Sequence, residues 1–172
     1  MDYILDIGEG CYFHPSAVLN APIFRLEFVE GKSYRRQMPH FARTFIGNDV
    51  HVFANTSIEG GWKEGTIIKD HVWIDNNCLI GHDVVLHERV CIAGMSIVAG
   101  VVEIGRDSFL GVGCTIRPEI TIGERCYIGA GCTVYKDVPD GMVVRTDSKM
   151  VMRPNPHYPP NSSDIYPQVT EN

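Results

Sequence analysis

Residues 68–104 read IKDHVWIDNNCLIGHDVVLHERVCIAGMSIVAGVVEI, and in this stretch every sixth residue is aliphatic. The period continues without a slip as far as Val134. Its twelve positions are Ile68, Ile74, Ile80, Leu86, Ile92, Val98, Ile104, Leu110, Ile116, Ile122, Ile128 and Val134. Four residues after each of them stands a second column that is small or apolar throughout, beginning with Val72 and Cys78. A period of six excludes ordinary half-buried strands, which would alternate with a period of two.

This hexapeptide period predicts an all-β protein, a parallel β-helix of about six coils. Three hexads close one triangular coil of about 18 residues, and successive coils stack at about 4.8 Å, so the prism should stand roughly 29 Å tall. The aliphatic positions should point inward and form the core. Gly or Ala often follows the aliphatic residue, as at Gly81 and Ala93. We expect these glycines at corners, where a positive φ is readily accepted.

The period is interrupted twice. Residues 20–45 alternate around a Glu-Gly-Lys turn and predict a protruding hairpin, and residues 59–66 form a short inserted loop. The β-helix domain should therefore cover residues 1–145. Residues 146–172 are rich in Pro and Asn and predict an extended tail, which would lie on a neighbouring subunit.

Composition narrows the classes of function. The chain has 172 residues and a net charge of -6, which argues against nucleic acid as a partner. No run of 18 apolar residues and no signal peptide is present, so we expect a cytoplasmic protein without membrane insertion. Five of the six cysteines fall in the small column and none form a C-x-x-C motif, so we expect buried thiols rather than disulfides or a metal site.

The polar run 74–94 is the densest place for chemistry. His82 is third in its hexad and should lie on a corner, where a histidine can act as a general base. Asp75 and Asp83 are the nearest residues that could orient it. Gly100 lies 18 residues further, one coil above, so its N–H could stabilise an oxyanion formed at His82. A solvated surface histidine is the alternative.

Further positions could bind ligands. Small residues should leave a groove for a pantetheine arm, with its phosphates near a lysine, or should simply pack the corners: Gly111, Gly113, Gly129, Ala130 and Lys136. Arg35 and Arg36, on the basic hairpin, could bind a substrate phosphate or be solvated. Trp62, on the inserted loop, either caps the prism or borders a ligand. Asn76, in the polar run, is a further candidate for substrate contact.

Two stretches resemble known families. Residues 44–94, TFIGNDVHVFANTSIEGGWKEGTIIKDHVWIDNNCLIGHDVVLHERVCIAG, resemble the UDP-3-O-acylglucosamine N-acyltransferases of lipid A synthesis. Residues 128–141, IGAGCTVYKDVPDG, are similar to the acetyl-CoA-dependent sugar N-acetyltransferases of the left-handed β-helix superfamily. We expect no counterpart of the domains that precede the β-helix in these families, so any nucleotide binding should fall to the hairpin or the tail.

The resemblance implies a left-handed coil and a homotrimer with active sites between subunits. It implies that His82 takes a proton from an acceptor amine, that Asp75 assists it and that the Gly100 amide polarises a thioester carbonyl. The expected function is transfer of an acetyl group from acetyl-CoA to an amino sugar, most simply a nucleotide-linked one. An acyl-carrier-protein donor and O-acetylation of a sugar hydroxyl remain alternatives.

Two other classes compete with this interpretation. His82 and His87 match the H-x4-H pair of the γ-class carbonic anhydrases, which bind zinc through three histidines. No third histidine stands at a matching place, since His51 and His71 both miss it. A scaffold without catalysis is the other alternative, and it predicts no role for His82.

Overall fold

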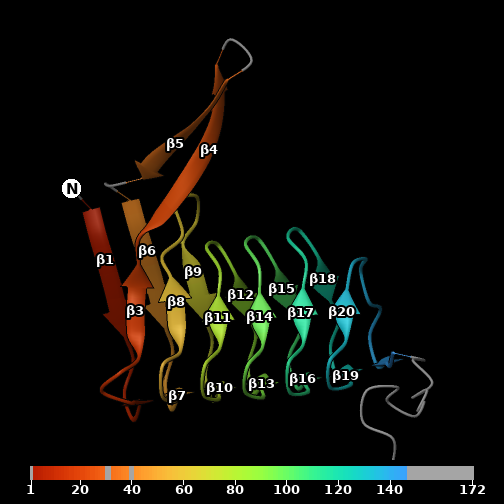
Figure 1. Cartoon of the computed structure of the whole chain (residues 1–172). Helices are drawn as coiled ribbons and strands as arrows, with labels where there is room; N and C mark the ends of the chain where they lie inside the picture. Colours follow the sequence, from red (N-terminus) through yellow and green to blue (C-terminus); the bar gives the residue numbers. More distant parts are fainter. Residues whose placement is uncertain (1, 30–31, 39–40, 147–172) are drawn as a thin grey trace, which may run out of the picture.

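The computed structural model describes residues 2–29, 32–38 and 41–146, and within them the chain forms a left-handed parallel β-helix (Figure 1). Three parallel sheets make the faces of the prism. Face A consists of β1 (Asp2–Ile7), β6 (Phe41–Ile46), β9 (Thr66–Ile68), β12 (Val85–Leu86), β15 (Glu103–Ile104) and β18 (Thr121–Ile122). Face B consists of β2 (Tyr12–Phe13), β7 (His51–Val52), β10 (Trp73–Ile74), β13 (Cys91–Ile92), β16 (Phe109–Leu110), β19 (Tyr127–Ile128) and β21 (Val143–Val144). Face C consists of β3 (Val18–Ala21), β8 (Ser57–Glu59), β11 (Leu79–Ile80), β14 (Ile97–Val98), β17 (Thr115–Ile116) and β20 (Thr133–Val134).

The register confirms the coil length expected from the sequence. On face B, Trp73 pairs with Cys91 and Cys91 with Phe109, each step being 18 residues. Each coil visits faces A, B and C in turn, so three corners run along the prism. We call them the A–B, B–C and C–A corners, after the two faces that each one joins.

The hexad positions form the core as predicted. All twelve aliphatic side chains from Ile68 to Val134 are at most 3% exposed, and they stack into one continuous cluster. Removing an Ile, Leu or Val side chain from water contributes about 1.5–3 kcal/mol. Cys78, Cys114 and Cys126 of the second column are buried, whereas Cys91 lies on the outer side of face B.

We expected the recurrent glycines to occupy corners because of a positive φ, and this expectation is wrong. Gly81 and Gly111 do not have a positive φ; the left-handed corner residues are mostly non-glycine, such as Asp83 and Val101. A Cβ on Gly81 would lie 2.7 Å from the N of Gly100, and one on Gly111 would lie 2.7 Å from the N of Ala130. These glycines are therefore required where the backbone of the next coil passes too close for a side chain.

Both interruptions of the period leave the prism at the C–A corner, the upper edge in Figure 1. The hairpin, β4 (Ile23–Val29) paired antiparallel with β5 (Lys32–Met38), joins β3 on face C to β6 on face A. It is shorter than the interval 20–45, because β6 already belongs to face A. The loop between β8 and β9 occupies the same corner one coil later. The expected tail lies outside the described residues, apart from Thr146.

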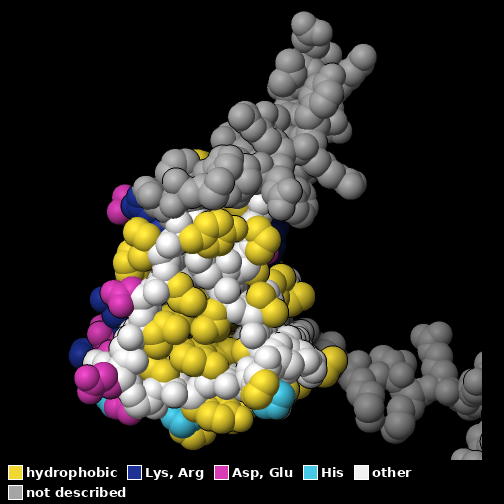
Figure 2. Space-filling model, turned by 90° about the vertical axis from the view of Figure 1, so that its left-hand side faces the viewer, with side chains coloured by type: hydrophobic (Ala, Val, Ile, Leu, Met, Phe, Trp, Pro, Cys, Tyr) yellow, Lys and Arg dark blue, Asp and Glu magenta, His cyan; other side chains and the backbone are white. Residues whose placement is uncertain are grey.

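Figure 2 looks onto the end of the prism formed by the first coil, where hydrophobic side chains gather. Ile4, Leu5 and Ile7 of β1, a strand of this first coil, are 37–45% exposed. Among the described residues, no helix is long and apolar enough to cross a membrane.

Candidate active site at the C–A corner

The C–A corner carries His82, which follows β11. The corner residues of the later coils lie further along the same edge of the prism. Gly100 follows β14 and Lys136 follows β20 on the same edge. The hairpin and the inserted loop lie on the coils immediately before His82. The fold thus brings four of the sequence features, His82, Gly100, Lys136 and the loop with Trp62, to a single edge of the prism.

The imidazole of His82 is held by the carboxylate of Asp83. Nδ1 of His82 lies 3.0 Å from Oδ2 of Asp83, and the two side chains are 32% and 6% exposed. An ionised carboxylate only accepts hydrogen bonds, so Nδ1 of His82 carries the hydrogen and donates a hydrogen bond to Oδ2 of Asp83. The lone pair of Nε2 is then available to accept a proton, the arrangement that a histidine base requires.

The inserted loop forms a cradle of N–H groups around Asp83. The backbone N of Lys63 donates to Oδ1 at 2.9 Å and that of Gly65 does so at 3.3 Å, while the N of Trp62 donates to Oδ2 at 3.3 Å. These N–H groups give the oxygens of the buried Asp83 carboxylate the hydrogen-bond partners that a buried polar group requires. The four residues inserted into the hexad period therefore form a loop that binds the carboxylate of Asp83, and Asp83 in turn binds the imidazole of His82.

Gly100 packs against the ring of His82. A Cβ on Gly100 would lie 2.6 Å from Nε2, so only glycine leaves room for the imidazole. The backbone N of Val101 donates to the carbonyl of His82 at 2.8 Å, which ties the two coils together. Within the described part of the chain, the N–H of Gly100 donates to no backbone carbonyl. Gly100, which packs against the imidazole of His82, thus has a backbone N–H without a backbone acceptor among the described residues.

Glu59 is a residue that the sequence reasoning missed. Its Oε2 accepts a hydrogen bond of 3.1 Å from the backbone N of His82. Burial raises the pKa of the Glu59 carboxyl, and the nearby His82 partly offsets that rise. Counting back one coil from Gly81, with the insertion included, leads to Glu59, so a register that allowed for the loop would have found it.

Asp75 and Asn76 lie on a different corner. They follow β10 on face B and therefore belong to the B–C corner. Oδ1 of Asp75 accepts from the N of Asn76 at 2.8 Å and from its Nδ2 at 2.7 Å, and Oδ1 of Asn76 accepts from the N of Ala54 at 3.0 Å. Within one chain, face C separates both residues from His82.

The small residues expected to form the cofactor groove also follow face B. Gly111, Gly113, Gly129 and Ala130 lie on the B–C corner, and a Cβ on Gly113 would meet nothing within 4 Å. Lys136, across face C, lines a pocket of about 460 Å³ at the C-terminal end of the prism. Tyr135 and Arg145 line this pocket too, so two cations border it.

The remaining predicted positions are those of the hairpin and the loop. Arg35 and Arg36 lie on β5, where the backbone register pairs them with Leu26 and Arg25. Their side chains lie outside the described residues. Trp62 is half-buried on the inserted loop, and Nζ of Lys63 lies 5.7 Å from the centre of its ring.

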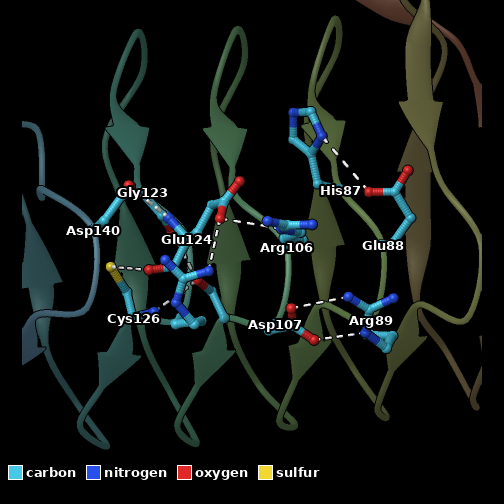
Figure 3. Close-up of polar contacts among 11 residues, drawn as sticks. His87, Glu88, Arg89, Arg106, Asp107, Gly123, Glu124, Cys126 and Asp140 are labelled. Atoms are coloured by element: carbon cyan, nitrogen blue, oxygen red, sulfur yellow. Dashed lines mark hydrogen bonds and ion pairs between the residues drawn. The ribbon is translucent and has the colours of Figure 1, made fainter.

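The A–B corner carries a separate set of charged residues (Figure 3). Nε2 of His87 lies 2.8 Å from Oε1 of Glu103, and Arg89 forms two hydrogen bonds with Asp107. A pocket of about 520 Å³ lies beside His87. Face A separates His87 from His82, and the described residues contain no group of three side chains placed to hold a metal ion.

Comparison with known proteins agrees with this fold. The family model for the bacterial transferase hexapeptide (six repeats) matches residues 65–100 and 102–136. UDP-3-O-acylglucosamine N-acyltransferase of Herminiimonas arsenicoxydans is 34% identical over 115 residues, which are 67% of this chain and 32% of that protein. The chain spans 30–38% of the length of three such relatives.

Among solved structures, acetyltransferases are similar to this chain. The acetyltransferase domain of PglB from Neisseria gonorrhoeae FA1090 is 26% identical, with a TM-score of 0.61 over 77% of this chain and 53% of that one. PerB from Caulobacter crescentus, in complex with CoA and GDP-perosamine, is 29% identical, with a TM-score of 0.60 over 77% and 52%. The chain is a left-handed β-helix of hexapeptide repeats. Its expected resemblance to UDP-3-O-acylglucosamine N-acyltransferases and nucleotide-sugar acetyltransferases is confirmed.

Proposed function

We propose that the chain is an acyltransferase that moves an acetyl group from acetyl-CoA to the amine of a nucleotide-linked amino sugar. The observation that carries the proposal is the contact between His82 and Gly100. The imidazole of His82 packs against Gly100, whose backbone N–H has no backbone acceptor among the described residues, and acyl transfer to an amine requires a base and such a donor close together.

In this mechanism, Nε2 of His82 takes a proton from the acceptor amine as the amine attacks the thioester carbonyl. Asp83 holds Nδ1 and balances the charge of the imidazolium that forms. The N–H of Gly100 stabilises the oxyanion of the tetrahedral intermediate. When the intermediate collapses, the carbon–sulfur bond breaks and the thiolate of CoA leaves with the proton held by His82.

Two findings support CoA as the donor. Lys136 and Arg145 border the pocket at the C-terminal end of the prism, where they could bind the phosphates of CoA. The structure of PerB contains CoA and that of the PglB acetyltransferase domain contains acetyl coenzyme A. In the proposed complex the pantetheine arm runs along Gly111, Gly113, Gly129 and Ala130. No metal takes part in this mechanism.

The acceptor side of the proposal rests on the C–A corner. The hairpin with Arg35 and Arg36 leaves the prism just before His82, at a place suited to bind the phosphates of a nucleotide-linked sugar. Trp62 borders the same corner. PerB was solved with GDP-perosamine, which is an amino sugar of this kind.

We further propose a homotrimer with each active site between two subunits. One chain places His82, Gly100 and Lys136 on the C–A corner but Asp75, Asn76 and the small residues on the B–C corner. A neighbour whose B–C corner faces the C–A corner would complete the site. The B–C side is apolar enough for such an interface, since Met95 is 68% exposed, Val112 54% and Ile97 43%.

Assembly has its own test. Light scattering of the purified protein should give three times the chain mass of 19.2 kDa. Variants His82→Ala and Asp75→Ala, each inactive alone, should regain activity when their subunits are mixed, because one mixed interface then carries both intact residues. A monomeric mass would contradict the proposed trimer. Mixtures of the two variants that stay inactive would contradict active sites formed by two subunits.

The chemistry itself is tested by thiol release from acetyl-CoA with a panel of amino nucleotide sugars, including GDP-perosamine. Rapid release with an amine acceptor, with one N-acetylated product, is the expected result. Release only with the matching hydroxyl sugars would favour O-acetylation, and release only from an acyl carrier protein would replace the donor. Activity that needs added zinc would favour the carbonic-anhydrase-like alternative.

A further inference from the structure

Glu59 brings a second carboxylate to the backbone of His82. It is the last residue of β8, below Gly81 in the stack of coils, and its Oε2 accepts the N–H of His82 at 3.1 Å. The residues above it on this edge, Gly81 and Ala99, are small. The side chain therefore has room to reach up to His82, and its second oxygen, Oε1, makes no hydrogen bond in the described part of the chain.

Two carboxylates, those of Asp83 and Glu59, contact His82 at this corner. Asp83 is bound by N–H groups and by His82, and Glu59 by one N–H group. Among the described residues, neither carboxylate forms an ion pair with Lys or Arg. The side chain of Glu59 is half-buried, and this burial raises the pKa of its carboxyl. A half-buried carboxylate without a counter-ion is stabilised by a cation that arrives with a ligand.

We propose that Glu59 is the residue that binds the ammonium group of the acceptor, and that it makes the site selective for amino sugars over their hydroxyl counterparts. This inference rests on the proposed function and deepens it. Neither the resemblance nor the hexad spacing assigns a role to Glu59.

The chemistry gives this contact a purpose. An aliphatic amine reaches the enzyme largely as R–NH3⁺, whereas a sugar hydroxyl is neutral. One ammonium proton is lost to solvent before attack, and a second passes to Nε2 of His82 as the carbon–nitrogen bond forms and the carbon–sulfur bond breaks. The products are the amide, the CoA thiol and the proton released to solvent. Glu59 would hold the cation beside His82 until the first proton leaves.

The test is Glu59→Gln, because the amide oxygen can still accept the N–H of His82 while the charge is lost. Glu64→Gln is the matched control, since Glu64 is an exposed glutamate on the same inserted loop. Binding of GDP-perosamine and of GDP-rhamnose, its hydroxyl counterpart, is measured by calorimetry without any acyl donor. Wild type and Glu64→Gln should bind the amine about tenfold or more tightly than the hydroxyl sugar, and Glu59→Gln should lose that preference.

The binding readout separates this inference from the proposed function. If the wild type prefers the amine through Glu59 but releases no thiol from acetyl-CoA, the role of Glu59 in binding the ammonium group is supported and the assignment as an acetyltransferase is refuted. If the wild type binds both sugars equally or binds neither, or if Glu59→Gln keeps the preference, the inference is overturned, whatever the activity. In turnover, the variant should raise the KM for the amine about tenfold and leave the KM for acetyl-CoA unchanged.

Discussion

Gly100 lies against the imidazole of His82 so closely that a Cβ on the glycine would come within 2.6 Å of Nε2. The contact joins two consecutive coils at one corner, and it is fixed by the hydrogen bond from the N of Val101 to the carbonyl of His82. The repeat therefore brings together residues that are one coil apart in the sequence.

Gly100→Ala should impair catalysis more than folding. The added methyl would push the imidazole out of place, so kcat should fall by about 10²-fold while circular dichroism shows an intact β-helix. Gly141→Ala is the control for an added methyl, because its Cβ would meet nothing within 4 Å, although Gly141, unlike Gly100, has a positive φ. Equal activity of the two variants would show that the contact with His82 does not matter.

Asp83→Asn should lower kcat by roughly 10²–10⁴-fold, since the neutral amide no longer favours the tautomer with the proton on Nδ1. The KM for acetyl-CoA should change little. Nitrogen-15 NMR of His82 provides a readout that a loss of stability alone would not move: the signal of protonated Nδ1 should be lost. Asp107→Asn, on the A–B corner, should leave both readouts unchanged, and an unchanged tautomer in Asp83→Asn would refute the role of Asp83.

The ion pair of Arg89 with Asp107 should stabilise the fold only above acidic pH (Figure 3). The guanidinium of Arg89 lowers the pKa of the Asp107 carboxyl from its ordinary value of 3.8. A lowered folded-state pKa gives stability that is present above 3.8 and is lost as the pH falls through the folded-state value. The loss of unfolding free energy in Arg89→Gln should therefore be measurable at pH 7 and vanish at low pH.

Urea unfolding of Arg89→Gln at several pH values measures this difference. High salt should also reduce it, because both side chains are exposed. Arg117→Gln, which removes an exposed arginine without an ion pair among the described residues, is the control. A difference that grows as the pH falls would have the wrong sign.

Val101→Asn should stabilise the protein. Val101 has a φ of 62°, in the left-handed region that costs an L-residue about 1–2 kcal/mol and that Asn accepts more readily. A gain of about 1 kcal/mol should raise Tm by about 2–4 °C for a domain of this size. Val143→Asn, at an exposed position without a positive φ, should bring no such gain. A lower Tm in Val101→Asn would contradict the strain argument.

The sequence predicts the fold well because each aliphatic residue of the hexad has one inward direction and each coil has one length. The explanation offered for the recurrent glycines was wrong, since a count of residues gives no information on how closely the next coil passes. The site was predicted in part. Hexad spacing paired His82 with Gly100, because positions 18 residues apart must stack.

The partners of His82 were harder to predict. The resemblance favoured Asp75, which in one chain lies on another corner, and the residue that contacts Nδ1 is Asp83. Glu59 was hidden because the inserted loop shifts its column by four residues. Whether a second chain brings Asp75 to the site depends on assembly, which hexad spacing within one chain does not encode.

The central claim is that His82 is the base of an acyl transfer to an amine. Thiol release from acetyl-CoA with the best amino nucleotide sugar, measured for wild type, His82→Ala and His87→Ala, tests it most directly. His87 is the matched control, because it is a partly exposed histidine on another corner, paired with Glu103. We expect kcat to fall roughly 10²–10⁴-fold in His82→Ala and to stay near wild type in His87→Ala. Turnover by His82→Ala within about twofold of wild type would contradict it.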